Sequence, residues 1–166
     1  AGILAGLAVA IPLGAIGVLI VDLGVQGGFR PAFTAGLGTA LADGLYATVA
    51  AVAGLAVGAW LAPAERAIAL AGAAALAAVG LYGLAVLRRE PAARALPPAD
   101  HRLVGRFLAL TAINPATAAT FAGLIVGLPA VAHASAPGKA AFVAGAFGAS
   151  LAWQSTLAGG GALMRH

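Results

Sequence analysis

The fold is decided by residues 32–59, AFTAGLGTALADGLYATVAAVAGLAVGA, an apolar run that contains one charged side chain, Asp43. The run exceeds the roughly 20 residues that a membrane-spanning helix needs. A lone carboxylate near the middle of such a helix is energetically costly, and ionisable residues at this depth mark transport paths and functional sites. Asp43 therefore indicates transport chemistry rather than a structural scaffold.

Similar apolar runs fill most of the chain. Of its 166 residues, 62% are hydrophobic and 8% are charged, and the mean hydropathy of +1.02 leaves too little polar surface to cover a soluble globule. Five runs reach spanning length: residues 2–21, 32–59, 67–87, 107–131 and 140–164. They lack the alternation of apolar and polar residues that marks a transmembrane barrel. The sequence predicts an all-α fold, a polytopic membrane helix bundle.

The basic residues predict an orientation. When the chain is threaded through the membrane as five spans, seven basic residues fall on one side and two on the other. The seven are Arg30, Arg88, Arg89, Arg94, Arg102, Arg106 and Arg165, and the two are Arg66 and Lys139. Because basic loops stay in the cytoplasm, we expect the Arg-rich loops there and the N-terminus outside. The pI of about 10.8 does not indicate nucleic-acid binding, since these residues lie in separate loops rather than on one basic face.

A weak internal repeat divides the single transmembrane domain, residues 1–166, into two parts around a Pro- and Arg-rich cytoplasmic linker at 88–106. IPLG at 11–14 precedes GTALAD at 38–43 in the first repeat, residues 1–87; INPA at 113–116 precedes GASLAW at 148–153 in the second, residues 107–166. Three spans per repeat would insert in opposite orientations, as in many secondary transporters. A 3+3 inverted repeat has six spans, whereas the sequence contains five apolar runs of spanning length. Because the chain opens without Met and stops after an apolar run, we expect a fragment whose second repeat is incomplete.

Three unusual features share one depth. At about 1.5 Å per residue, Pro12, Asp43 and Asn114 fall near the centre of a hydrocarbon core about 30 Å thick. Pro12 and Pro115 each remove an amide donor, which takes the helical partner from the carbonyl four residues earlier, at Ala8 and Thr111. Broken backbone survives at this depth only where protein or a watery cavity surrounds it. The sequence therefore predicts a midplane site.

Four segments resemble the LysE/RhtB family of amino-acid exporters: IPLGAIG at 11–17, GFR at 28–30 leading to GLGTALAD at 36–43, LTAINPAT at 110–117, and GASLAW at 148–153. The resemblance covers nearly the whole chain in the family's order. It implies a six-helix inner-membrane exporter that uses the proton or ion gradient, without a cofactor, to expel amino acids or related metabolites. The family's acidic residue falls on Asp43 and its Asn-Pro pair on Asn114 and Pro115. Ala116 replaces the Lys that often follows this pair, and Ala42 replaces a Gly.

The site hypothesis assigns Asp43 to bind a proton and a cationic amine in turn, which would give proton-coupled antiport. The alternative is a packing role, with Thr39 and Tyr46 one turn away to satisfy the carboxylate. The broken helices would hold the carboxylate and amine of the substrate; the alternative for Pro12 is a simple kink. The residues of these breaks are Pro12, Thr111, Asn114 and Pro115, and Trp153 and Gln154 add a polar cluster in the fifth run. Bonding between helices is the alternative for that cluster.

Other functions fit the residues less well. An intramembrane protease needs paired aspartates or a Ser with a His at membrane depth, whereas His101 and His133 fall in loops, so no enzyme or metal site is expected. The absence of cysteine eliminates a thiol electron carrier. Proline-broken helices fit alternating access better than a channel. A non-transporting membrane subunit or assembly factor stays open, as do a homodimer through Gly-rich faces and the identity of the substrate.

Overall fold

A computed structural model of the protein describes residues 2–11, 14–61, 98–127 and 129–165, together with single positions between 63 and 81. Its helices are α1 (Gly2–Ala10), α2 (Ala15–Gly27), α3 (Phe29–Leu61), α5 (His101–Ala112), α6 (Pro115–Gly127), α7 (Pro129–Ala132) and α8 (Ala136–Leu163). The described ranges contain no strand, which confirms the all-α prediction. The third predicted span, residues 67–87, lies outside the described residues apart from single positions, so the number of spans stays a prediction.

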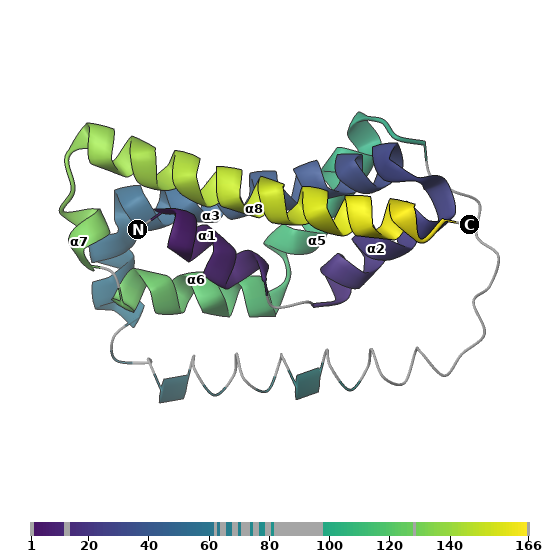
Figure 1. Ribbon diagram of the computed structural model, residues 1–166. Helices are drawn as coiled ribbons and strands as arrows, with labels where there is room; N and C mark the ends of the chain where they lie inside the picture. Colours follow the sequence, from purple (N-terminus) through teal and green to yellow (C-terminus); the bar gives the residue numbers. More distant parts are fainter. Residues whose placement is uncertain are drawn as a thin grey trace.

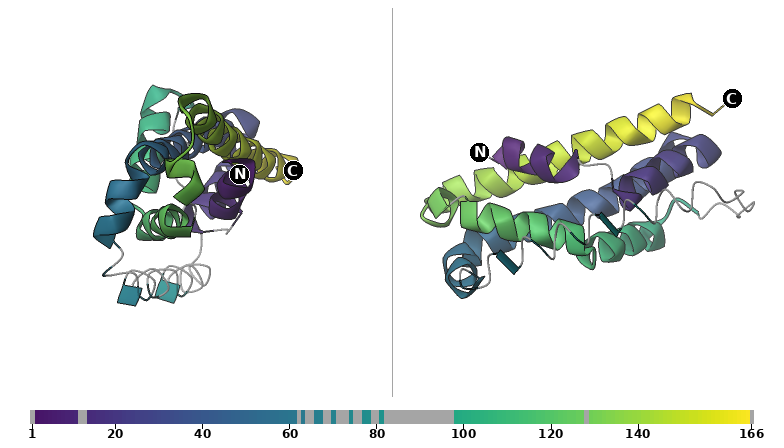
Figure 2. Two further views of the ribbon diagram at one scale, coloured as in Figure 1. Left: turned by 90° about the vertical axis from the view of Figure 1, so that its left-hand side faces the viewer. Right: turned by 90° about the horizontal axis from the view of Figure 1, so that it is seen from below.

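Two long helices and two broken ones build the bundle (Figure 1). α3 and α8 run its full length, while α1 followed by α2, and α5 followed by α6, each cover that length in two pieces. α8 packs against α1, α2 and α3, and α3 also packs against α5 and α6. Figure 2 shows the same arrangement from one end and from below. The two breaks therefore lie beside the middle of the long helices.

The first break interrupts the predicted span 2–21. α1 ends at Ala10, α2 starts at Ala15, and the two helices are bent by 77°. α2 continues to Gly27, beyond the predicted end of the span, and stops where Gly28 adopts φ 81°, a left-handed conformation that favours glycine. The predicted break is therefore present, but Pro12 itself lies outside the described residues.

The second break interrupts the predicted span 107–131. α5 begins at His101, inside the predicted linker, because the Asp100 carboxylate accepts hydrogen bonds from the amides of Arg102 and Leu103 and caps the helix. It ends at Ala112, and α6 starts at Pro115. The start of α8 likewise precedes the predicted residue 140, because Ser135 caps that helix at Ala136. Side-chain caps, which the apolar pattern does not record, explain these shifted starts.

Glycine contacts join α1 and α2 to α8. A Cβ atom added to Gly6 would lie 2.5 Å from the carbonyl oxygen of Ala146, and one added to Gly24 would lie 2.9 Å from the amide nitrogen of Ala162. One added to Gly161 would collide with the carbonyl oxygen of Val21. Small residues that let helix backbones touch are characteristic of helix packing in membranes. A side chain at any of these positions would push two helices apart.

The outer face of α3 is apolar and its inner face holds the carboxylate. Leu41, Leu45, Val49 and Val52 form an exposed stripe one turn apart, and Val52 is 72% exposed. Asp43, from the same stretch of helix, is only 3% exposed. Residues Phe29–Ala53 of α3 are long and apolar enough to cross a membrane, and α1 with α2 meets the same criterion as one bent segment. An apolar exterior around a buried acid fits a lipid environment.

The basic side chains gather at one end of the bundle. The Nη1 atom of Arg165, after α8, lies 2.9 Å from the Cβ position of Gly28, just before Arg30 in α3. α5, which begins near Arg102 and Arg106, starts at the same end (Figure 1), whereas Lys139 lies in the first turn of α8 at the other end. In the ranges 14–61, 98–127 and 129–165, Arg30, Arg102, Arg106 and Arg165 thus lie toward one end of the bundle and Lys139 toward the other.

Candidate functional site

The two long helices share a buried polar band. Along α8, the buried face carries Ser150 and Gln154 one turn apart, and along α3 it carries Thr39 and Asp43 with the same spacing. Apart from these four, Thr111 of α5 is the other buried polar side chain among the described residues. The polar groups of the bundle are therefore concentrated at a single level.

A cluster of apolar side chains packs on each side of the polar band. The Phe121 cluster comprises Ala5, Ala47, Ala51, Phe121, Phe142 and Ala146. The Phe107 cluster comprises Ile20, Ala32, Ala35, Leu103, Phe107 and Ala158. Along α3 the order is Phe107 cluster, polar band, Phe121 cluster, and along α8 it is the reverse. The polar band thus lies between two layers of packed side chains.

Asp43 forms a hydrogen bond across the band. The Ser150 hydroxyl donates to Asp43 Oδ2 at 2.6 Å, and both side chains are buried, Ser150 fully. This bond joins α3 to α8 at the centre of their contact. The local partners that the packing alternative offered do not bond Asp43: Thr39 donates weakly to the Ala35 carbonyl at 3.4 Å, and Tyr46 donates to the Ala112 carbonyl.

A cavity of about 60 Å³ opens beside Asp43 and is lined by residues of six helices and of the two breaks. These residues are Val9, Ala10, Gly14, Ile16, Gly17, Thr39, Asp43, Thr111, Asn114, Thr117 and Gln154. A single water needs roughly 10–15 Å³ of such space, whereas sites for drug-sized ligands are about 300 Å³ or larger. In this conformation the cavity has room for a few waters or a small polar group.

Gln154 lines this cavity and carries a buried, unsatisfied acceptor. Its side chain is 5% exposed, and its Oε1 atom has no hydrogen-bond partner among the described residues. A buried polar atom without a partner costs about 1–3 kcal/mol, so such atoms need a specific reason in a native protein. A ligand or water in the adjoining cavity would supply the missing donor.

The second break supplies Thr111 and Asn114 to the cavity. The Thr111 hydroxyl donates to the Phe107 carbonyl at 2.8 Å. The Thr111 carbonyl, which loses its helical partner to Pro115, accepts instead from the Asn114 amide at 3.1 Å. A tighter turn thus replaces the missing bond, and Asn114 lines the cavity directly in front of Pro115, the first residue of α6.

Tyr46 lies beside the cavity rather than in its wall. Its hydroxyl donates to the Ala112 carbonyl at 2.7 Å, and its ring stacks on Phe121 with centroids 5.0 Å apart. The side chain therefore holds α3 to α5 before the break and to α6 after it. Sequence reasoning placed Tyr46 near Asp43 but gave no indication of this role.

Trp153 also lies outside the cavity wall, and its indole Nε1 is buried without a partner among the described residues. Four features of the site were not predicted: Ser150, Thr117, the end of α1 at Val9 and Ala10, and the start of α2 at Gly14, Ile16 and Gly17. The spacing of Ser150 and Gln154, one helical turn apart in an apolar run, is the signal that could have identified Ser150.

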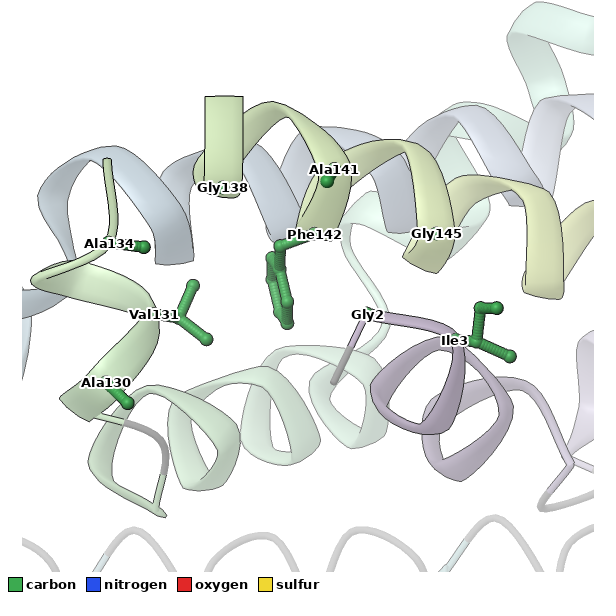
Figure 3. Close-up of a pocket in the computed structure, with 9 residues that line it drawn as sticks. All are labelled: Gly2, Ile3, Ala130, Val131, Ala134, Gly138, Ala141, Phe142 and Gly145. Carbon is green, nitrogen blue, oxygen red and sulfur yellow. The ribbon is translucent and has the colours of Figure 1, made fainter. Parts of the chain in front are cut away.

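A second pocket, of about 400 Å³, lies at the Lys139 end of the bundle (Figure 3). Its wall comes from α1, α7 and the first half of α8, including Ile3, Val131 and Phe142, and all its side chains are small or apolar. Phe142 also belongs to the Phe121 cluster, which separates this pocket from the polar band. The pocket has no group to fix a polar ligand, and no set of three His, Cys, Asp or Glu that could hold a metal occurs in the described part of the chain.

The comparisons with known proteins give one match. The family model described as LysE type translocator matches residues 7–166, nearly the whole chain. No curated protein and no solved structure matches it. The matched range includes the polar band, both breaks and, apart from Ala5, both apolar clusters.

Proposed function

The chain belongs to the family of LysE type translocators, which are membrane transporters, and from this premise we propose that it is an inner-membrane secondary transporter that exports amino acids or related small metabolites. Asp43 is the centre of the proposed site and exchanges a proton for the amine of the substrate, which gives proton-coupled antiport. The observation that carries the proposal is a buried carboxylate beside a polar cavity, inside a helix whose outer face is apolar.

The layered interior supports alternating access. A transporter must close its site on each side in turn, and here packed apolar side chains lie on both sides of the polar band. The cavity of about 60 Å³ is too small for most amino acids, so loading requires movement of at least one cluster. The larger pocket beyond Phe142 would then serve as a vestibule on the side away from the Arg residues.

The distribution of charge supports the orientation. Arg30, Arg102, Arg106 and Arg165 at one end would face the cytoplasm, because basic residues are retained there. The vestibule and Lys139 would face outward, in the direction of export. The inverted repeat remains part of the proposal, and its two matched helices, α3 and α8, run in opposite directions and contribute Asp43 and Gln154 to one cavity.

Efflux from proteoliposomes tests the function. The purified chain is reconstituted with a panel of labelled amino acids inside, an imposed pH gradient drives exchange, and Asp43→Asn is compared with the wild type. We expect Asp43→Asn to lose at least tenfold in flux and to lose its response to the pH gradient. Asp22→Asn is the matched control, because Asp22 is exposed and bonds only Gln26 on its own helix.

Unchanged flux and pH response in Asp43→Asn would show that the coupling role is wrong. Absence of flux for every amino acid of the panel, from protein that remains folded, would favour a non-transporting membrane subunit instead.

A further inference from the structure

The start of α2 has the properties of an anion site. α2 begins at Ala15 after Gly14, and no side chain caps it. The first amides of any α-helix have no acceptor within the helix and carry the positive end of its dipole. Gly14, Ile16 and Gly17, from this first turn, all line the cavity. The first turn of α2, whose amides have no acceptor within the helix, therefore borders the same small space as Asp43.

A second helix begins at the same cavity. Asn114 precedes α6, the Ala118 amide donates to the Asn114 carbonyl at 3.1 Å, and Asn114 and Thr117 both line the space. Two helix N-termini thus converge on one point of the bundle, each where a broken span resumes. Discontinuous helices whose N-termini meet at midplane are a recurrent way to bind an anionic group of a transported substrate.

Other polar groups of the cavity offer hydrogen-bond acceptors, whereas the helix N-termini offer donors. Asp43 is an acceptor, and Gln154 contributes Oε1, which is buried and has no partner in the described structure. These acceptors come from α3 and α8, whereas the N-termini come from α2 and α6. The unsatisfied Gln154 oxygen is evidence for a ligand with a donor group, independent of the helix termini. A ligand that pairs with both the donors and the acceptors carries an anionic group and a donor group, as a zwitterion does.

We propose that the first turn of α2, together with the start of α6, forms an anion subsite that binds the carboxylate of a zwitterionic substrate while Asp43 and Gln154 bind its ammonium. This inference rests on the proposed transport function and deepens it. The subsite would distinguish amino acids from amines by the carboxylate of the ligand. A molecule with an ammonium but no carboxylate leaves the α2 amides unpaired and binds poorly.

The test removes one amide without removing the helix. Proline is favoured at the first position of a helix, and Gly14 already has the extended ψ of −175° that a following proline requires. Ala15→Pro therefore deletes one first-turn N–H. His101→Pro is the matched control: it makes the same change at the first position of α5, and the Asp100 cap uses the amides of Arg102 and Leu103, which remain.

Leucine, lysine and threonine are each paired with the amine formed by removing the carboxylate. Exchange flux in proteoliposomes and equilibrium binding in detergent are measured for each pair. We expect at least one amino acid to bind about tenfold or more better than its amine. Ala15→Pro should weaken its binding and raise its KM about fivefold to fiftyfold with kcat little changed, and should leave the amine unaffected. His101→Pro should behave as wild type.

The inference is overturned if amino acids and amines bind equally, or if Ala15→Pro is folded and leaves amino-acid binding unchanged. Thr117→Val, at the start of α6, supplies a second variant if Ala15→Pro does not fold, and unchanged binding there would count equally against the subsite. Binding that depends on Ala15 without any flux would support the subsite while refuting transport, which separates this inference from the function on which it rests.

Discussion

Ser150 Oγ lies 2.6 Å from Asp43 Oδ2 although the two residues are 107 positions apart in the chain. The bond fixes one carboxylate oxygen in the contact between α3 and α8, beside the cavity. Ser150 does not line the cavity, so its effect on a ligand passes through Asp43. Ser150 is therefore a positioning residue.

Ser150→Ala should lower transport about fivefold to thirtyfold, because a hydrogen bond to a carboxylate contributes roughly 1.5–3 kcal/mol and somewhat less inside membranes. The effect should appear in the pH dependence of flux as well as in the rate. Ser155→Ala is the control, since the Ser155 hydroxyl bonds only the Leu151 carbonyl of its own helix. Equal effects of the two substitutions would show that Ser150 has no special connection to Asp43.

Gln154→Leu should separate stability from function. Replacing a buried amide whose Oε1 has no partner with an apolar side chain of similar size removes a desolvation cost of about 1–3 kcal/mol. We expect an unchanged or higher melting temperature in detergent together with at least a tenfold loss of flux. A lower melting temperature with normal flux would indicate that Gln154 serves packing alone.

Gly161→Ala should destabilise the bundle by about 1–3 kcal/mol, because its methyl group would collide with the Val21 carbonyl of α2. Thermal unfolding in detergent measures the effect. Gly160→Ala, at the neighbouring position, is the control because nothing lies within 4 Å of its Cβ position. Similar melting temperatures for both variants would contradict the close approach of α2 and α8.

The orientation can be mapped by labelling cysteines, because the chain contains none of its own. His133→Cys and His101→Cys place single thiols at exposed positions near opposite ends of the bundle. A membrane-impermeant maleimide added to intact cells should label the cysteine at position 133 and should reach position 101 only after lysis. The reverse pattern would overturn the proposed orientation.

Sequence patterns predicted much of this fold, since the apolar runs account for α3, α8 and both broken spans. The break before Pro115 follows from proline chemistry, and the burial of Asp43 fits its place in the middle of the apolar run. The helix starts at His101 and Ala136 were missed because Asp100 and Ser135 act through local side-chain bonds, outside the hydropathy signal.

The candidate site was predicted less completely. Asp43, Asn114, Thr39, Thr111 and Gln154 line one cavity, and their role in binding stays a prediction. The spacing of Ser150 and Gln154 marks a polar face of α8, but which residue bonds Asp43 depends on how α3 and α8 face each other. The distant partner of Tyr46, the Ala112 carbonyl, likewise depends on the packing of α3 against the break.

The glycine contacts form two groups of helices, and Gly36 of α3 joins the groups, because a Cβ atom added there would lie 2.8 Å from the Cβ atom of Gln154 in α8. α1 and α2 press their backbones directly on α8, whereas α3 holds α5 and α6 through Gly38, which approaches the Val104 carbonyl, and through Tyr46. The cavity lies on the seam between these groups, and the Asp43–Ser150 bond crosses it. Any movement of α3 against α8 would therefore act on that bond, so a change in the protonation of one carboxylate would be felt on both sides of the seam.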